Sequence, residues 1–323
     1  MSPAPHAPAE FVVTAIGSVL PPDGAAHPWF DHRAELGRGY RYLPPSCQYL
    51  LAATKRALSR NGTGEALLAL PEEDRAIAVG TNQGVAGVHA EVDQATVAGE
   101  AHLLSPNAVP YFSPNLVASR VAMEHGLKGF SLAVHSQGSA GLEALQAGLR
   151  ALRSGRARWL LAGAAEAPLP DADKAAVRGS GRTEDGALAL VVEEADAVRS
   201  RGGRALGRVQ VRSVSLSPSA AGSEAGVEGA RAALAAAGAG LGVTALTHRS
   251  VRLVGDGSPV ARAVAGALAD SGAAVDGVSA GTGCLLAVQE VAHALTRPDG
   301  DRLIVTATGA GGVVVARVVP EAA

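Results

Sequence analysis

The sequence predicts an α/β protein with mainly parallel strands, built from two similar halves, and three observations support this. Short apolar runs alternate with stretches of helical periodicity along the 323 residues, which is typical of strands joined by helices. Many of the 40 glycines stand at the ends of the apolar runs, where strand-to-helix turns need them. Residues 142–164 also align without a gap on residues 285–307, as an internal repeat would.

In the first half, buried-type runs predict strands and apolar residues at helical spacing predict helices. Prolines and glycines predict a loop over residues 21–39. The helix at 115–126 is expected to end at Gly126, because glycine commonly terminates helices. The expected strands are 11–19, 76–80, 130–134 and 159–164, and the expected helices are 46–59, 115–126 and 142–153.

The second half repeats this order of elements. A turn is expected over residues 277–283, directly before the last helix. The expected strands are 187–193, 209–215, 251–254, 303–307 and 313–319, and the expected helices are 228–237, 260–269 and 285–295. The aligned segments lie near the end of each half, so we predict two tandem units, residues 1–170 and 171–323.

Composition and charge exclude several classes of function. Hydrophobic residues make up 47% and charged residues 18% of the chain, which excludes a disordered protein. With 28 basic residues, 30 acidic residues and 3% aromatics, nucleic acid is not an expected partner. No apolar run approaches the roughly 20 residues that cross a bilayer, so no membrane partner is expected. The histidines show no metal-ligand spacing, and neither a metal nor a cofactor is expected.

Cysteine usage and the N-terminus indicate the compartment. Cys47 and Cys284 are the only cysteines, too few for a disulfide framework, so a reducing environment is expected. The first ten residues contain prolines and an acidic residue, where a signal peptide would carry positive charge and then an apolar stretch. The sequence therefore predicts a cytoplasmic protein.

Several stretches, in this order along the chain, form a recognisable set. Residues 130–145 read FSLAVHSQGSAGLEAL and residues 153–163 read RSGRARWLLAG. Residues 184–193 read EDGALALVVE, RSRG follows at 199–202, and residues 308–312 read TGAGG. Together they resemble the β-ketoacyl synthases, which have the thiolase-like fold. The resemblance implies two pseudo-repeated α/β halves, each with a mixed five-stranded sheet, stacked as a layered αβαβα sandwich.

The resemblance also implies that the reactive groups of a condensing enzyme are missing. Such an enzyme needs a cysteine at a helix N-terminus, where the thiolate is favoured, and two histidines that stabilise developing negative charge. Aligned on the family, these positions are Gly138, Val254 and Gly277. None of these side chains can attack a thioester or donate a hydrogen bond. We therefore expect a chain that condenses nothing alone.

This combination is similar to the chain length factors, or β subunits, of type II polyketide synthases. They lack the nucleophile, often carry glutamine there, and form heterodimers with an active ketosynthase. Gln137 and Ser139 flank Gly138, and Ala310 lies in the glycine loop, so we interpret them as a pseudo-active site. The resemblance implies two partners, a catalytic ketosynthase and an acyl carrier protein, in polyketide (antibiotic) or fatty acid chain elongation.

Residues 107–115 carry the predicted tunnel and interface residues. In the resembling family this segment lies at the dimer interface, near the foot of the acyl tunnel. Large side chains there would stop a growing chain, because a densely packed interior does not yield to extra methylenes. Tyr111 and Phe112 would then be walls, Ser113 an opening and Asn115 part of the interface. The alternative is an ordinary capped loop.

Two other functions stay open. Residues 135–138 (HSQG) imitate the nucleophile elbow of hydrolases, so Ser136 or Ser139 could serve an acyltransferase or thioesterase, with His248 as base. Cys284, at the start of a predicted helix, is the other candidate nucleophile. The third function is a homodimeric scaffold that takes no acyl ligand.

Overall fold

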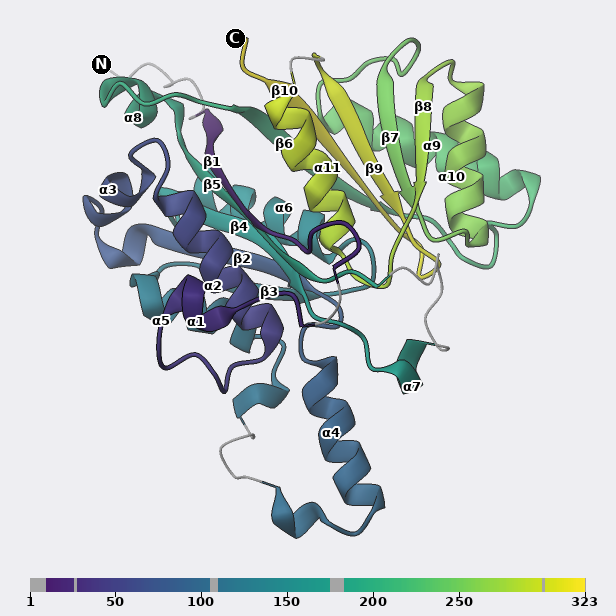
Figure 1. The fold of residues 1–323 in the computed structure, drawn as a ribbon. Helices are drawn as coiled ribbons and strands as arrows, with labels where there is room; N and C mark the ends of the chain where they lie inside the picture. Colours follow the sequence, from purple (N-terminus) through teal and green to yellow (C-terminus); the bar gives the residue numbers. More distant parts are fainter. Residues whose placement is uncertain (1–9, 26–27, 105–109, 175–182, 298–299, 323) are drawn as a thin grey trace.

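The computed structural model describes residues 10–25, 28–104, 110–174, 183–297 and 300–322 (Figure 1). The strands are β1 (Phe11–Val19), β2 (Arg75–Thr81), β3 (Ser131–His135), β4 (Trp159–Glu166), β5 (Gly186–Glu194), β6 (Gly207–Ser215), β7 (Ser250–Gly255), β8 (Ala274–Ser279), β9 (Arg302–Ala307) and β10 (Gly312–Pro320). The α-helices are α1 (His32–Leu36), α2 (Pro45–Leu58), α3 (Thr63–Leu68), α4 (Ala86–Val97), α5 (Leu116–His125), α6 (Ala140–Arg153), α7 (Asp171–Lys174), α8 (Ala195–Ser200), α9 (Glu224–Gly240), α10 (Pro259–Asp270) and α11 (Leu285–Thr296).

The strand order contains one pattern twice. The 10-stranded sheet runs β3-β2-β4-β5-β1-β6-β10-β9-β7-β8. Read outward from the β1–β6 contact, both arms have the same order and the same directions, because β2 is parallel to β3 and β4 while β7 is parallel to β8 and β9. The remaining pairs are antiparallel. The prediction of mainly parallel strands was therefore wrong, since β9 returns to β10 through a tight glycine turn rather than a crossover helix.

The position of β5 bears on where one half ends. β5 follows residue 170 in sequence, yet it pairs with β1 and β4 of the first arm. The second arm begins with β6, which meets β1 at one residue pair, Val13 and Gly207. The division into residues 1–170 and 171–323 stays a prediction.

Helices cover the sheet in layers. α6 and α11 pack between the two arms, and their Leu145, Leu149 and Val291 share one core with Leu190 and Val314 of the strands. α2 and α5 cover the outer face of the first arm, while α9 and α10 cover that of the second. The expected layered αβαβα sandwich is confirmed.

Several elements differ from the sequence expectation. The helix α1 lies inside the expected loop 21–39, where the Asp31 carboxylate caps its N-terminus through the backbone N–H groups of Arg33 and Ala34. The strand β8 replaces the first part of the expected turn 277–283, and its exposed edge position left no alternating apolar pattern to detect.

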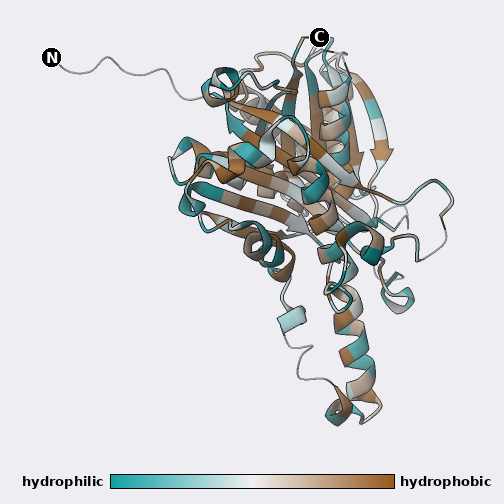
Figure 2. Ribbon diagram, turned by 60° about the vertical axis from the view of Figure 1, so that its left-hand side comes forward, coloured by the Kyte–Doolittle hydropathy of each residue, from teal (hydrophilic) through white to brown (hydrophobic). Residues whose placement is uncertain are grey.

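The helix α4 forms an arm that projects from the body of the protein (Figures 1 and 2). The sequence did not predict it, since none of its described residues is buried and an apolar face is the main signal of a helix. Apolar side chains are nevertheless exposed along this arm, Val97 at 90% and Leu103 at 70%. In the described part of the chain, no helix is long and apolar enough to span a bilayer.

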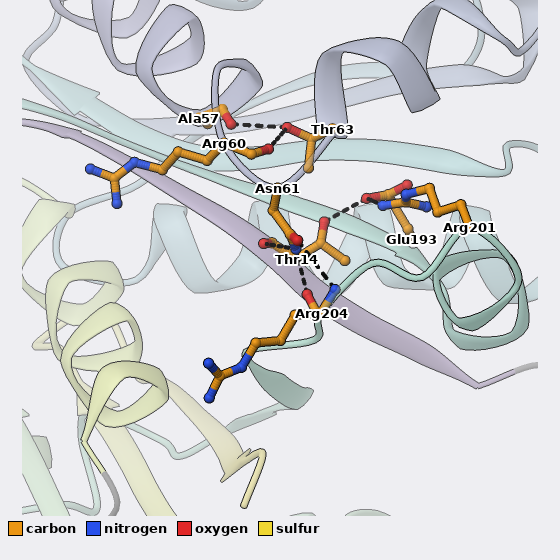
Figure 3. A network of polar contacts seen from close by, with 8 residues as sticks. All are labelled: Thr14, Ala57, Arg60, Asn61, Thr63, Glu193, Arg201 and Arg204. Atoms are coloured by element: carbon orange, nitrogen blue, oxygen red, sulfur yellow. Dashed lines mark hydrogen bonds and ion pairs between the residues drawn. The ribbon is translucent and has the colours of Figure 1, made fainter. Parts of the chain in front are cut away.

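A polar network that is buried at Thr14 and Glu193 and exposed at Asn61 and Arg204 holds the contact between β1 and β6 (Figure 3). Asn61 has a φ of +52°, a conformation that asparagine tolerates, and its side chain bonds the carbonyls of Thr14 and Arg204 and the N–H of Arg204. Thr14 Oγ1 donates to Glu193, which also accepts from Arg201 at 2.8 Å. Side-chain groups thus bridge the two arms where the backbone ladder is shortest.

Candidate functional site

A polar pocket lies at the carboxyl ends of β3, β7 and β9, beside the N-terminus of α6. Its volume is about 560 Å³. Parallel strands bring their carboxyl ends to one edge of a sheet, so residues far apart in sequence meet here. The lining consists of Ser136, Gln137, Ser139, Glu143, Ser215, Asp256, Thr308, Gly309, Ala310, Gly311 and Gly312.

The carboxylate of Glu143 organises the α6 side of the pocket. It accepts hydrogen bonds from Ser139 Oγ at 2.8 Å and from Ser136 Oγ at 3.1 Å. Because Ser139 and Glu143 are four residues apart, helix geometry brings them together, and the positive end of the helix dipole favours the carboxylate. The pocket thus presents a fixed negative charge with two hydroxyl groups bound to it.

Asp256 organises the opposite side. Its carboxylate accepts from the backbone N–H of Gly309 at 2.7 Å and of Ser258 at 3.0 Å. Ser258 in turn caps α10 by accepting from the N–H of Ala261. One carboxylate therefore ties the loop after β7 to the glycine loop between β9 and β10.

Gly138 lies at the turn before α6, with its missing side chain toward this glycine loop. Its φ is +72° and its N–H donates to the carbonyl of Gly283 at 3.0 Å. A Cβ at this position would lie 3.0 Å from Cγ2 of Thr308, so a larger side chain would project toward the pocket wall. The structure brings four of the predicted pseudo-active-site positions together: Gln137, Gly138, Ser139 and Ala310.

The two expected histidine positions do not line the pocket. Val254 is only 3% exposed and packs with Ala280 and Leu286 in a small apolar cluster. Gly277 lies on the exposed edge strand β8, opposite Leu253. The structure thus places Ala280 beside Val254 and leaves Gly277 away from the site.

The structure does not assemble the hydrolase-like alternative. His248 precedes β7, at the strand end opposite to the pocket, and its N–H donates to the carbonyl of Gly272. His135 is the last residue of β3 and lies outside the pocket lining. Among the pocket's described lining residues, Ser136 and Ser139 therefore have a carboxylate as partner and no imidazole. No described His, Cys, Asp and Glu residues cluster in a way that could hold a metal ion.

Cys284 directly precedes α11 and is buried inside the protein. Its side chain is 1% exposed, and burial, followed by the nearby charge of Glu166, raises the pKa of its thiol well above the usual value. Cys47 is fully buried, and burial raises its pKa to about 12. Neither environment favours a thiolate.

Two buried carboxylates surround the start of α11. Glu166, which is 0% exposed, accepts from the backbone N–H groups of Asn82, Gln83 and Cys284 at 2.8–2.9 Å. Burial raises the pKa of Glu166 to about 7, although hydrogen bonds from Gln83 and Cys284 lower it. Glu184 accepts from the N–H groups of the next two residues, Leu285 and Leu286. We call Glu166 and Glu184 the α11 carboxylate pair.

The predicted tunnel and interface residues lie on the segment after the α4 arm, outside the pocket lining. Phe112 is 37% exposed and stacks on His89 with ring centroids 5.4 Å apart. Tyr111 packs against the core beneath α2 and α5. Ser113 accepts from the N–H of Asn115, which precedes α5. Residues 107–109 of the predicted segment lie outside the described residues.

The carboxylates that shape the site were not predicted from the sequence. Glu143 stands four residues after Ser139, a spacing that could have indicated their contact once a helix was expected there. Asp256 stands two residues before Ser258 in a glycine-rich turn, which favours a local side-chain-to-backbone bond. Glu166 gave no comparable signal, since its partner Cys284 is 118 positions away.

Comparisons with known proteins agree with this fold. Residues 27–184 match the family model described as "Beta-ketoacyl synthase, N-terminal domain". A comparison with curated proteins finds no match.

Solved structures with the same fold cover nearly the whole chain. The ishigamide ketosynthase/chain length factor is 21% identical, with a TM-score of 0.77 over 97% of this chain and 100% of that one. A β-ketoacyl synthase from Burkholderia phymatum is 16% identical, with a TM-score of 0.75 over 97% and 100%. A type II polyketide synthase acyl-carrier protein in complex with its hexaketide-bound ketosynthase gives 16% identity and a TM-score of 0.72 over 96% and 99%.

Proposed function

We propose that the chain is a non-catalytic subunit of the chain length factor type, because residues 27–184 match the β-ketoacyl synthase N-terminal domain and the whole chain shares the fold of solved ketosynthases. In this proposal it pairs with a catalytic ketosynthase that acts on acyl groups bound to an acyl carrier protein. The supporting observation is a formed pocket beside the turn that carries Gly138, which is the position that the resemblance gives for the nucleophile. Such a pair would work in the cytoplasm.

The pocket's own chemistry disfavours condensation. Decarboxylative condensation requires a nucleophile, and then donors that stabilise negative charge developing on a thioester oxygen. Here the charged side chains of the lining, Glu143 and Asp256, are both acidic. Carboxylates repel the acid group of a malonyl unit, so the partner would have to supply the reactive groups.

The proposed contribution of this chain is shape and contact surface. Large exposed apolar side chains are expected where a partner covers them, and Val97, Leu103 and Phe112 lie on and after the α4 arm. Phe112 would then border the acyl chain or the partner, and its size would limit how far a growing chain can extend.

Reconstitution tests this proposal. The chain is co-expressed with a catalytic ketosynthase of a type II polyketide synthase, and the native mass and elongation of a carrier-bound acyl group with malonyl units are measured. We expect a one-to-one complex, elongation by the complex, and none by this chain alone. Elongation by the isolated chain would overturn the proposal, and a stable homodimer with no affinity for the ketosynthase would favour the scaffold function.

A pair of variants tests the proposed contact surface. Val97→Asp places a charge on the α4 arm and should prevent the complex. Leu68→Asp is the matched control, because Leu68 is also an exposed apolar residue, at 74%, but lies on α3. Equal loss of the complex in both variants would argue against the arm. In the intact complex, Phe112→Ala should give longer products.

A further inference from the structure

Three arginines meet at the end of α6 that lies farthest from the polar pocket. Arg150 and Arg153 are in the last turn of α6, and Arg212 comes from the middle of β6. Together with Gln146 and Ser154 they line a second pocket of about 430 Å³. Residues 146, 150 and 153 are spaced by four and three, so they share one helix face. We call this the arginine pocket.

The positive charge of the arginine pocket has no acidic partner among the residues that the structure describes. Within the described residues, no carboxylate forms an ion pair with Arg150, Arg153 or Arg212, whereas Arg249 and Arg317 share Asp301 elsewhere. The guanidinium groups also affect one another, because burial and then the charge of Arg212 lower the pKa of Arg153. Like charges held together without a counter-ion are unfavourable.

Helix dipoles offset only part of this charge. The C-terminus of α6 attracts cations, and Arg212 lies against the end of α9, where a Cβ on Gly240 would come within 2.8 Å of its Nε. A helix end carries roughly half an elementary charge. Two such ends therefore leave a net positive site.

Of the two polar neighbours, Gln146 adds a donor to the arginine pocket and Ser154 does not. Ser213 Oγ donates to Gln146 Oε1 at 2.7 Å, which orients the amide and leaves its NH₂ group as a donor. Ser154 Oγ donates to the carbonyl of Ala151, so its oxygen can accept but its proton is engaged. Guanidinium groups and an amide NH₂ form a set that binds an anion with several oxygens.

We propose that the arginine pocket binds a soluble phosphate group, as inorganic phosphate, diphosphate or a phosphate monoester. The planar guanidinium fork matches the spacing of phosphate oxygens and binds them through two hydrogen bonds. Three forks on a concave surface suit a dianion better than a single carboxylate. The proposal does not rest on the proposed function, because this pocket and the pocket at Gly138 have no lining residue in common.

Calorimetry with inorganic phosphate and diphosphate at fixed ionic strength tests this proposal. We expect saturable binding, tighter for diphosphate, that is weakened about tenfold or more by Arg153→Gln or Arg212→Gln. The matched control is Arg199→Gln, which removes the same charge from an exposed ion pair on α8 and should leave the affinity unchanged. Equal weakening by all three variants, or absence of saturable binding, would overturn the proposal.

A conservative variant distinguishes recognition by the guanidinium fork from non-specific electrostatic attraction of the anion. Arg153→Lys keeps the positive charge but loses the fork. Circular dichroism of each variant checks that α6 is intact. We expect Arg153→Lys to bind diphosphate more weakly than the native protein and more tightly than Arg153→Gln. Native affinity in Arg153→Lys would contradict recognition by the guanidinium fork.

Discussion

The first turns of α6 and α11 hold matching places in the two arms of the sheet, yet they meet opposite surroundings. α11 starts inside the protein, where the α11 carboxylate pair accepts the N–H groups of its first residues. α6 starts at the polar pocket, and the side chain of Ser139 at its N-terminus makes no capping hydrogen bond. The start of α11 therefore connects the two arms, and we call it the joint. The start of α6 lines a pocket that is open to a ligand.

The joint is where the largest stability effect is expected. Glu166→Gln replaces one of the two acceptor oxygens by an NH₂ group, so at least one of the three backbone N–H groups loses its acceptor and faces another donor. A buried donor left without a partner costs about 1–3 kcal/mol, and the contact between two donors adds to this cost, so we expect a loss of roughly 3 kcal/mol in the free energy of unfolding. Urea unfolding measures it. A loss below about 1 kcal/mol would show that the joint tolerates a neutral acceptor.

The same carboxylate gives a pH dependence. Its pKa is raised from an ordinary 4.5 to about 7, so the folded state binds a proton more tightly than the unfolded state. The stabilisation is fully present below pH 4.5 and is lost as pH rises through about 7, amounting to roughly 3 kcal/mol. Urea midpoints measured across this range should fall with rising pH, and the fall should be much smaller in Glu166→Gln.

Alanine substitutions of two glycines, one at each helix start, should give a smaller difference in the free energy of unfolding. A Cβ on Gly283 would lie 2.6 Å from Cγ of Glu166, in a closed space, so Gly283→Ala should cost about 2 kcal/mol by overpacking. A Cβ on Gly138 would meet only Thr308, at 3.0 Å, so the cost of Gly138→Ala should come mainly from the positive φ and amount to about 1 kcal/mol. Equal costs would mean that the α6 turn is as tightly packed as the α11 turn.

Much of this architecture could be predicted from the sequence, because most strands and helices bury an apolar face. The helix 46–59 was expected from Leu50 and its neighbours and is found as α2. The α4 arm and β8 escaped detection because an exposed helix and an exposed edge strand have no such face. Apolar patterning indicates burial, so it gives no signal for elements that lie outside the core.

The site was predictable only in part, for a related reason. Gln137 and Ala310 could be placed together because short motifs resemble a known family. The contact between Glu166 and Cys284 depends on how the two arms pack, which local sequence does not determine. Glu143 lies between these cases, since its contact with Ser139 follows from helix spacing alone.

The smallest stability effect is expected at the open helix start. Glu143→Gln leaves an acceptor for Ser136 and Ser139 in a pocket that reaches solvent, so we expect at most about 0.5 kcal/mol in the free energy of unfolding. Urea unfolding beside Glu166→Gln gives the direct contrast. If Glu143→Gln were as damaging as Glu166→Gln, the α6 turn would also be a structural joint. The pocket would then be a by-product of packing rather than a surface kept open for a ligand.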